Sequence, residues 1–216
     1  MTRVKVCGIT SEADLDVAVA SGADAIGLIA DVAVDTPREI DPALATELAA
    51  SAPPFVSTVL VTMPQTPERA IDLAARVDPD AVQLHGRIPP GDVAYLRSRV
   101  DGDVLLAVDA EEIEVARRYD EVVDGFVVDP VDEDGAGGTG RTHDWTHTRE
   151  AVETLSSPIV LAGGLTPENV AEAIATVRPF AVDVASGVES TGGVKDETLV
   201  RAFVEAARNG VRTVEP

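Results

Sequence analysis

Short runs of apolar, often β-branched residues alternate along the chain with longer amphipathic segments. Several of these runs are apolar throughout, which is typical of strands buried on both faces of a parallel sheet. The pattern predicts eight strands separated by helical segments. The predicted strands are Arg3–Cys7, Ala25–Ala30, Phe55–Val61, Ala81–Leu84, Val104–Val108, Gly125–Val128, Pro158–Ala162 and Phe180–Val184.

The segments between the apolar runs carry recognisable helix start and stop signals. Thr10-Ser11-Glu12 opens the first predicted helix, whose apolar stripe is Leu15, Val17 and Ala18, and Gly22 ends it. Asp41-Pro42 predicts an N-cap followed by proline at the first helical position. The same signature recurs at Thr66-Pro67-Glu68 and Thr166-Pro167-Glu168, and further helices are predicted over Asp92–Val100, Ala110–Arg118, Trp145–Leu155 and Asp196–Arg208, the last ending near Gly210.

Eight strand–helix units in 216 residues fit a compact (β/α)8 barrel, the TIM barrel, forming a single domain over residues 1–216. A doubly wound open sheet is the alternative. It usually has fewer strands, however, and no G-x-G-x-x-G follows the first apolar run. The longest irregular stretch, Pro130–Asp144, follows the sixth strand. Long loops after barrel strands are usually functional.

Composition narrows the class of protein. Apolar residues make up 45% of the chain and aromatic residues 3%, so aliphatic side chains must build the core. The single cysteine, Cys7, excludes an internal disulfide. No apolar run approaches the roughly 18–20 residues of a membrane helix, and the N-terminus lacks a signal-peptide pattern. We therefore expect a cytoplasmic protein that does not enter membranes.

The charge balance is strongly acidic, with 17 Lys+Arg against 38 Asp+Glu and a net charge of −21. Lys5 and Lys195 are the only lysines. Such a chain would repel nucleic-acid phosphates, so we expect no nucleic-acid partner. Acid excess together with lysine scarcity favours a surface adapted to high salt, where self-repulsion is screened. An ordinary acidic enzyme is the alternative.

Two residues at predicted strand ends are candidates for acid–base chemistry, because the C-terminal ends of barrel strands face the active site. Cys7 ends the first strand, although a cysteine there is often only a small buried hydrophobe. Asp129 follows the apolar sixth strand, where an unpaired carboxylate would be costly to bury. Together they could form an acid–base pair across the barrel mouth.

Glycine turns after the last strands predict a phosphate site made by backbone N–H groups. They are Gly163-Gly164 and Ser186-Gly187. The segment Gly135–Gly140, including Gly138 and Gly140, could wrap the same phosphate or act as a lid. Tight turns alone would also explain these glycines.

Other polar residues near strand ends fit a functional and a structural interpretation equally well. Arg38 could grip a carboxylate through two parallel hydrogen bonds or lie on the solvated surface. His85 could line a ligand site or sit satisfied in the core, and Asp109 is ambiguous. Asp183, flanked by valines, could bond neighbouring backbone. No Cys/His cluster or H-E-x-x-H is present, so we predict no metal.

Several motifs, in order along almost the whole chain, resemble those of the phosphoribosylanthranilate isomerase family. The specific part is the K-V-C-G-I-T start combined with an aspartate followed by G-G-T-G and D-W. The matching segments are Val4-Lys5-Val6-Cys7-Gly8-Ile9-Thr10, Gln83-Leu84-His85-Gly86, Asp129, Gly137-Gly138-Thr139-Gly140-Arg141-Thr142-His143-Asp144-Trp145, Leu161-Ala162-Gly163-Gly164-Leu165, Ser186-Gly187-Val188-Glu189 and Gly193-Val194-Lys195-Asp196.

The resemblance implies an Amadori rearrangement in tryptophan biosynthesis, with no cofactor and a small phosphorylated substrate. It implies that Asp129 is the general acid and the Cys7 thiolate the general base. It further implies that Arg38 holds the anthranilate carboxylate and His85 lines the site. The phosphate would be held by Gly163, Gly164, Ser186 and Gly187, with Gly138 and Gly140 also contacting substrate.

Two alternatives remain at this stage. A histidine-pathway ribotide isomerase performs a similar rearrangement. Resemblance to that family would require a pair of aspartates, one of them on the first strand, where this chain has Cys7. A barrel that binds phosphorylated metabolites without turnover is the non-enzymatic alternative. We expect a monomer or a homodimer.

Overall fold

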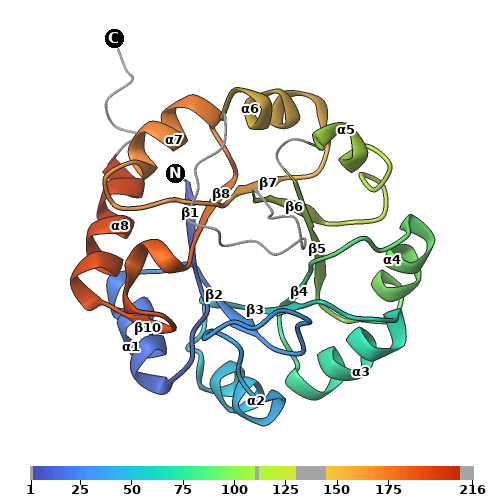
Figure 1. The fold of residues 1–216 in the computed structure, drawn as a ribbon, viewed down its shortest axis with the longest axis horizontal. Coiled ribbons are helices and arrows are strands. Elements are labelled where there is room, and N and C mark those ends of the chain that lie inside the picture. Colours follow the sequence, from blue (N-terminus) through green and yellow to red (C-terminus); the bar gives the residue numbers. More distant parts are fainter. Residues whose placement is uncertain (1, 110–111, 130–144, 210–216) are drawn as a thin grey trace.

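In the computed structural model, eight parallel strands close into a barrel in the order of the chain (Figure 1). The structure describes residues 2–109, 112–129 and 145–209. The predicted (β/α)8 barrel is confirmed, and the open sheet is excluded because β8 pairs with β1. The strands are β1 Arg3–Cys7, β2 Ala25–Ile29, β3 Ser57–Thr62, β4 Ala81–Leu84, β5 Asp103–Val108, β6 Gly125–Val128, β7 Ile159–Leu161 and β8 Ala181–Val184.

Helices surround the barrel, and most begin where the sequence signals them. The side chains of Ser11, Asp41 and Thr66 each accept a hydrogen bond from a backbone N–H in the first helical turn. Gly22 ends the first helix at φ 89°. The helices are α1 Glu12–Ser21, α2 Pro42–Ser51, α3 Pro67–Val77, α4 Pro90–Arg97, α5 Ile113–Ala116, α6 Trp145–Thr154, α7 Val170–Val177 and α8 Glu197–Asn209.

Three helix predictions need correction. The fourth helix spans Pro90–Arg97, so it begins two residues and ends three residues before the predicted Asp92–Val100. The seventh helix begins at Val170 rather than after Thr166, because Asn169 organises a turn before it. The Asn169 side chain accepts from the Thr166 backbone N–H and donates to the Gly164 carbonyl. The fifth helix spans only Ile113–Ala116, shorter than the predicted Ala110–Arg118, whose first two residues lie outside the described part.

A small hairpin after β8 was not predicted. A 3-10 turn, η1 (Ser186–Val188), leads into β9 (Glu189–Thr191), which pairs antiparallel with β10 (Val194–Lys195). The residues of β9 are partly or fully exposed and those of β10 are too few to show an alternating pattern. The apolar periodicity that predicts the barrel strands is therefore missing here.

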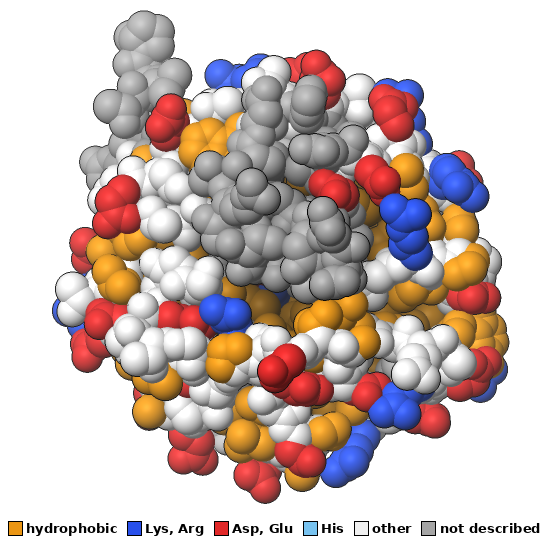
Figure 2. All heavy atoms as spheres, viewed as in Figure 1, with side chains coloured by type: hydrophobic (Ala, Val, Ile, Leu, Met, Phe, Trp, Pro, Cys, Tyr) orange, Lys and Arg blue, Asp and Glu red, His pale blue; other side chains and the backbone are white. Residues whose placement is uncertain are grey.

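Period-two alternation in β1 separates the core from the site. Val4 and Val6 belong to the main cluster between strands and helices, while Lys5 and Cys7 take the alternate positions. That cluster is built mainly of Val, Leu, Ile and Ala, as the composition predicts. None of the described helices is long and apolar enough to span a membrane. Acidic side chains are dispersed around the visible face of the molecule (Figure 2).

Candidate active site

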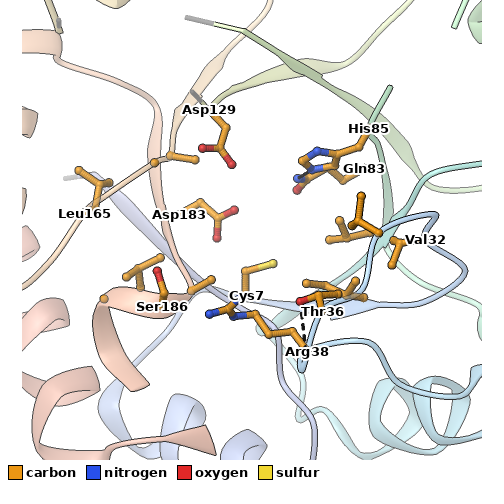
Figure 3. A pocket seen from close by; sticks show the side chains of 18 of the residues that line it. Cys7, Val32, Thr36, Arg38, Gln83, His85, Asp129, Leu165, Asp183 and Ser186 are labelled. Atoms are coloured by element: carbon orange, nitrogen blue, oxygen red, sulfur yellow. Dashed lines mark hydrogen bonds between the residues drawn. The ribbon is translucent and has the colours of Figure 1, made fainter. Parts of the chain in front are cut away.

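A cavity lies at the C-terminal ends of the barrel strands. Figure 3 shows side chains from widely separated parts of the chain converging on it. Every predicted site residue that the structure describes lines this cavity: Cys7, Arg38, His85, Asp129, Gly163, Gly164, Ser186 and Gly187. Gly138 and Gly140 lie outside the described residues, as do the rest of 130–144.

The thiol of Cys7 and the carboxyl of Asp129 face the same cavity from β1 and from the end of β6 (Figure 3). Both residues are buried, with exposed fractions of 6% and 7%. Gly27 on β2 makes room for the thiol, since a Cβ there would lie 2.6 Å from Cys7 Sγ. The Asp129 backbone N–H donates to the Val108 carbonyl, which fixes the chain at the end of β6.

A buried lysine stands beside the thiol. Lys5 Nζ donates to Asp183 Oδ2 at 2.7 Å and to Gln83 Oε1 at 3.0 Å. Lys5 and Asp183 are register partners of β1 and β8, so barrel closure brings them together. Asp183, whose role the sequence left open, therefore pairs with a lysine. Lys5 and Gln83 were not predicted as site residues, although a lysine two positions before Cys7 in a buried strand is a signal that could have indicated Lys5.

Burial and neighbouring charges compete to set the protonation of this group. Burial raises the pKa of the Cys7 thiol above its usual range; the Lys5 ammonium works against this shift and the Asp183 carboxylate adds to it. Burial alone would lower the pKa of Lys5, but Asp183 and Cys7 more than offset it and the Lys5 pKa is raised. Lys5 is thus a fixed cation beside a thiol that is mostly protonated at neutral pH.

Lys5 also sets the tautomer of the His85 ring, because it fixes the orientation of the Gln83 amide between them. Gln83 Oε1 accepts from Lys5, so its Nε2 is the end that lies 2.7 Å from His85 Nε2. Gln83 Nε2 can only donate, so His85 Nε2 accepts and the ring proton sits on Nδ1. Burial, reinforced by the Lys5 ammonium, lowers the pKa of His85 to about 4. His85 is therefore a neutral side chain lining the cavity.

Arg38 lines the cavity and is held by a carboxylate. Its Nε and Nη2 donate to the two oxygens of Glu189 at 2.9 and 2.8 Å. The side chain of Arg38 is 17% exposed, which excludes the solvated surface arginine. Glu189 was not predicted as the partner of Arg38, because the pairing depends on the unpredicted hairpin.

The two glycine turns lie against each other at one side of the cavity. Gly163 and Gly164 have φ of 84° and 61°, a region that favours glycine. Gly187 packs directly on the β7–α7 loop, since a Cβ there would lie 2.0 Å from the Leu165 carbonyl oxygen. Backbone groups of both turns are thus accessible to one ligand. Across the described ranges, no group of His, Cys, Asp and Glu is arranged to hold a metal ion.

Fold and cavity together define a (β/α)8-barrel enzyme whose site lies at the C-terminal ends of the strands. Residues 4–206 match the family model described as N-(5'phosphoribosyl)anthranilate (PRA) isomerase. The chain belongs to the PRA isomerase family.

Relatives named N-(5'-phosphoribosyl)anthranilate isomerase include proteins of halophilic archaea. The Halobacterium salinarum protein is 59% identical over 210 residues, covering 96% of each chain. The Natronomonas pharaonis protein is 58% identical over 207 residues, covering 96% of this chain and 98% of the relative.

Solved structures of the family share the fold. The isomerase from Thermotoga maritima is 38% identical with a TM-score of 0.87, covering 97% of this chain and all of that one. A phosphoribosylanthranilate isomerase in complex with reduced 1-(o-carboxyphenylamino)-1-deoxyribulose 5-phosphate is 36% identical with a TM-score of 0.84, with the same coverage.

Proposed function

We propose that this chain converts N-(5'-phosphoribosyl)anthranilate to 1-(2-carboxyphenylamino)-1-deoxyribulose 5-phosphate, an Amadori rearrangement of tryptophan biosynthesis. The observation that carries the proposal is one cavity lined by a buried thiol, Cys7, and a buried carboxyl, Asp129, together with Arg38 and two glycine turns. This set offers an acid, a base, a cation for a carboxylate and backbone donors for a phosphate.

The reaction begins with opening of the sugar ring. Asp129 gives its proton to the ring oxygen, and the bond between that oxygen and C1 breaks. The nitrogen lone pair forms a C1–N double bond, which leaves an open-chain iminium and an Asp129 carboxylate. Asp129 lines the cavity, so its carboxyl is placed to give the proton that starts the reaction.

The second step moves hydrogen from C2 towards C1. The Cys7 thiolate removes the C2 proton, and the electron pair of that bond forms a C1–C2 double bond while the iminium nitrogen becomes neutral. The resulting enolamine gives its enol proton to the Asp129 carboxylate and takes a proton at C1 from the Cys7 thiol, which yields the ketone and returns both residues to their starting states. Electrons and atoms balance within the substrate, so no cofactor is required. The iminium acidifies the C2 hydrogen, and Lys5 beside Cys7 stabilises the thiolate.

The remaining residues hold the substrate. Arg38 binds the anthranilate carboxylate, and His85 lines the site as a neutral ring. The phosphate is held by the backbone groups of Gly163, Gly164, Ser186 and Gly187. Gly138 and Gly140 contribute further contacts to the substrate.

A substrate comparison tests this function. Purified protein in molar KCl is assayed on N-(5'-phosphoribosyl)anthranilate and, separately, on the aminoimidazole-carboxamide ribotide intermediate of the histidine pathway. We expect turnover of the anthranilate compound, because the first strand presents Cys7 rather than an aspartate. Turnover of the histidine intermediate alone would reject the proposal, and binding of both without turnover would favour a non-enzymatic barrel.

We also infer a cytoplasmic enzyme that is a monomer or a homodimer. A solved relative from Thermotoga maritima, 35% identical, is described as monomers generated from a dimeric isomerase, which supports either state within the family. Light scattering in molar KCl distinguishes the two, and a larger assembly would reject the inference.

A further inference from the structure

Three loops meet around Arg38 at one edge of the cavity. They are the turn after β1, the β2–α2 loop that carries Arg38, and the β9–β10 hairpin that carries Glu189. The Arg38 and Glu189 side chains form a two-bond ion pair at 2.9 and 2.8 Å, and the Glu189 side chain is only 4% exposed. Paired bonds of this kind fix the plane of the guanidinium as well as its position.

Glu189 is itself held by the second of the two lysines. Lys195 Nζ lies 2.7 Å from Glu189 Oε1 and donates to the Ala185 carbonyl at 3.3 Å. The Lys195 side chain is fully buried, and its backbone N–H donates to Asp14 Oδ1 at 2.9 Å. Burial alone would raise the pKa of Glu189, but bonds from Arg38 and Lys195 lower it, so Glu189 is an anion.

Close packing leaves the Arg38 segment little freedom. A Cβ on Gly8 would lie 2.8 Å from Arg38 Cδ, so the arginine stem rests on the turn after β1. A Cβ on Gly193 would lie 2.4 Å from the Pro37 carbonyl oxygen. Thr10 Oγ1 donates to the Gly193 carbonyl at 2.7 Å, which ties the hairpin to the same turn. The hairpin therefore packs on Pro37 through Gly193, and it also bonds the Arg38 side chain through Glu189.

The pairing leaves Arg38 able to bind an anion. Within the described ranges, the guanidinium bonds all go to Glu189 through Nε and Nη2, so the Nη1 end remains for a ligand. Figure 3 shows the guanidinium reaching into the cavity near Cys7. Arg38 and Lys195 carry two positive charges against the single negative charge of Glu189, so the group keeps a net positive charge. Without Lys195, Glu189 would cancel the attraction for a carboxylate.

From this geometry we infer that Glu189, held by Lys195, is a positioning residue that aims Arg38 at the carboxylate of the substrate. The inference rests on the proposed function, in which Arg38 binds the anthranilate carboxylate. A different role, charge balance alone, makes the opposite prediction. If Glu189 only offset positive charge, its neutralisation would make the cavity more attractive to the anionic substrate.

Glu189→Gln removes both the negative charge and the two-bond pairing. It separates the two roles because positioning predicts a raised KM, whereas charge balance alone predicts a lowered KM. We expect KM to rise about 10- to 100-fold with kcat nearly unchanged, since a misdirected arginine loses a charged hydrogen bond to bound substrate. The double variant Glu189→Gln with Lys195→Met restores the net charge of the group, and we expect KM to stay raised. A lowered KM in Glu189→Gln, or a wild-type KM in the double variant, would overturn the inference.

Calorimetric titration distinguishes failure of this inference from failure of the proposed function. The probes are reduced 1-(o-carboxyphenylamino)-1-deoxyribulose 5-phosphate and the same compound without its ring carboxylate. We expect Glu189→Gln and Arg38→Ala to weaken binding of the first probe and to leave the second unchanged. If Arg38→Ala fails to discriminate between the probes, the role proposed for Arg38 is wrong. If only Glu189→Gln fails to discriminate, the positioning role is wrong.

Two further variants control for folding. Glu197→Gln breaks an exposed ion pair with Arg201 on α8, and we expect wild-type binding of both probes. Glu189→Asp keeps the charge but shortens the side chain, and we expect an intermediate loss confined to the carboxylate probe. Wild-type binding of that probe by a folded Glu189→Asp would also overturn the inference, so the test holds if Glu189→Gln does not fold.

Discussion

Both lysines of this strongly acidic chain are buried beside the cavity, where each pairs with a carboxylate. Each ammonium donates to one carboxylate oxygen and to one further oxygen, so neither buried charge lacks a partner. Strand-end positions predicted Cys7 and Asp129 from the sequence alone. They did not predict the partners of Lys5 and Lys195, because those pairings depend on the β1–β8 register and on the hairpin.

Variants of the Lys5–Asp183 pair test how these two charges set the pKa of the Cys7 thiol. Because the pKa of Cys7 is raised, kcat/KM of the wild type is expected to increase with pH through the neutral range as thiolate forms. Lys5→Met removes the opposing cation and should move this rise to higher pH, with about a tenfold loss at neutral pH for each pKa unit moved. Asp183→Asn removes an anion and should move it to lower pH. Profiles that shift in the same direction in both variants would contradict this account.

Elements with strong local signals were predicted best. Apolar runs located the barrel strands to within a residue or two, and side-chain caps located the starts of α1, α2 and α3. The hairpin and the late start of α7 were not predictable in this way. The hairpin is set by packing of Gly192 and Gly193 on Pro37, which is a long-range contact. The α7 start is set by the side chain of Asn169, a local contact that competes with the Thr166-Pro167 start signal.

Contact between the two glycine turns gives an element-scale prediction. Gly187→Ala places a Cβ against the Leu165 carbonyl and must push the β7–α7 and β8 loops apart. We expect at least a tenfold weaker affinity for inorganic phosphate, measured by calorimetry, and a lower melting temperature. Gly91→Ala in α4 is the matched control. A Cβ there meets open space, so stability should be unchanged or rise by about 0.5 kcal/mol. Equal effects of the two variants would argue against a phosphate site at these turns.

At the scale of the whole molecule, a net charge of −21 is carried largely by dispersed side chains of the surface. Such a surface repels itself at low ionic strength, whereas the buried pairs at the cavity are screened much less. The archaeal relatives from halophiles fit this interpretation of the composition.

Salt should therefore stabilise the whole protein. We expect the thermal midpoint to rise by several degrees, about 5 °C or more, between about 0.1 M and about 3 M KCl. Calorimetric or circular-dichroism melting curves across that range provide the measurement. Sucrose, which favours compact states without screening charge, is the control. A midpoint independent of KCl would contradict adaptation to salt.

The account as a whole depends on Cys7 and Asp129 acting on one substrate from the two sides of one cavity. The most direct measurement is steady-state turnover of N-(5'-phosphoribosyl)anthranilate by Cys7→Ser and Asp129→Asn, alongside binding of the reduced product analogue. We predict that each variant keeps its circular-dichroism spectrum and binds the analogue within about threefold of wild type, while kcat falls about 10²- to 10⁴-fold. Turnover near the wild-type rate in either folded variant would contradict it.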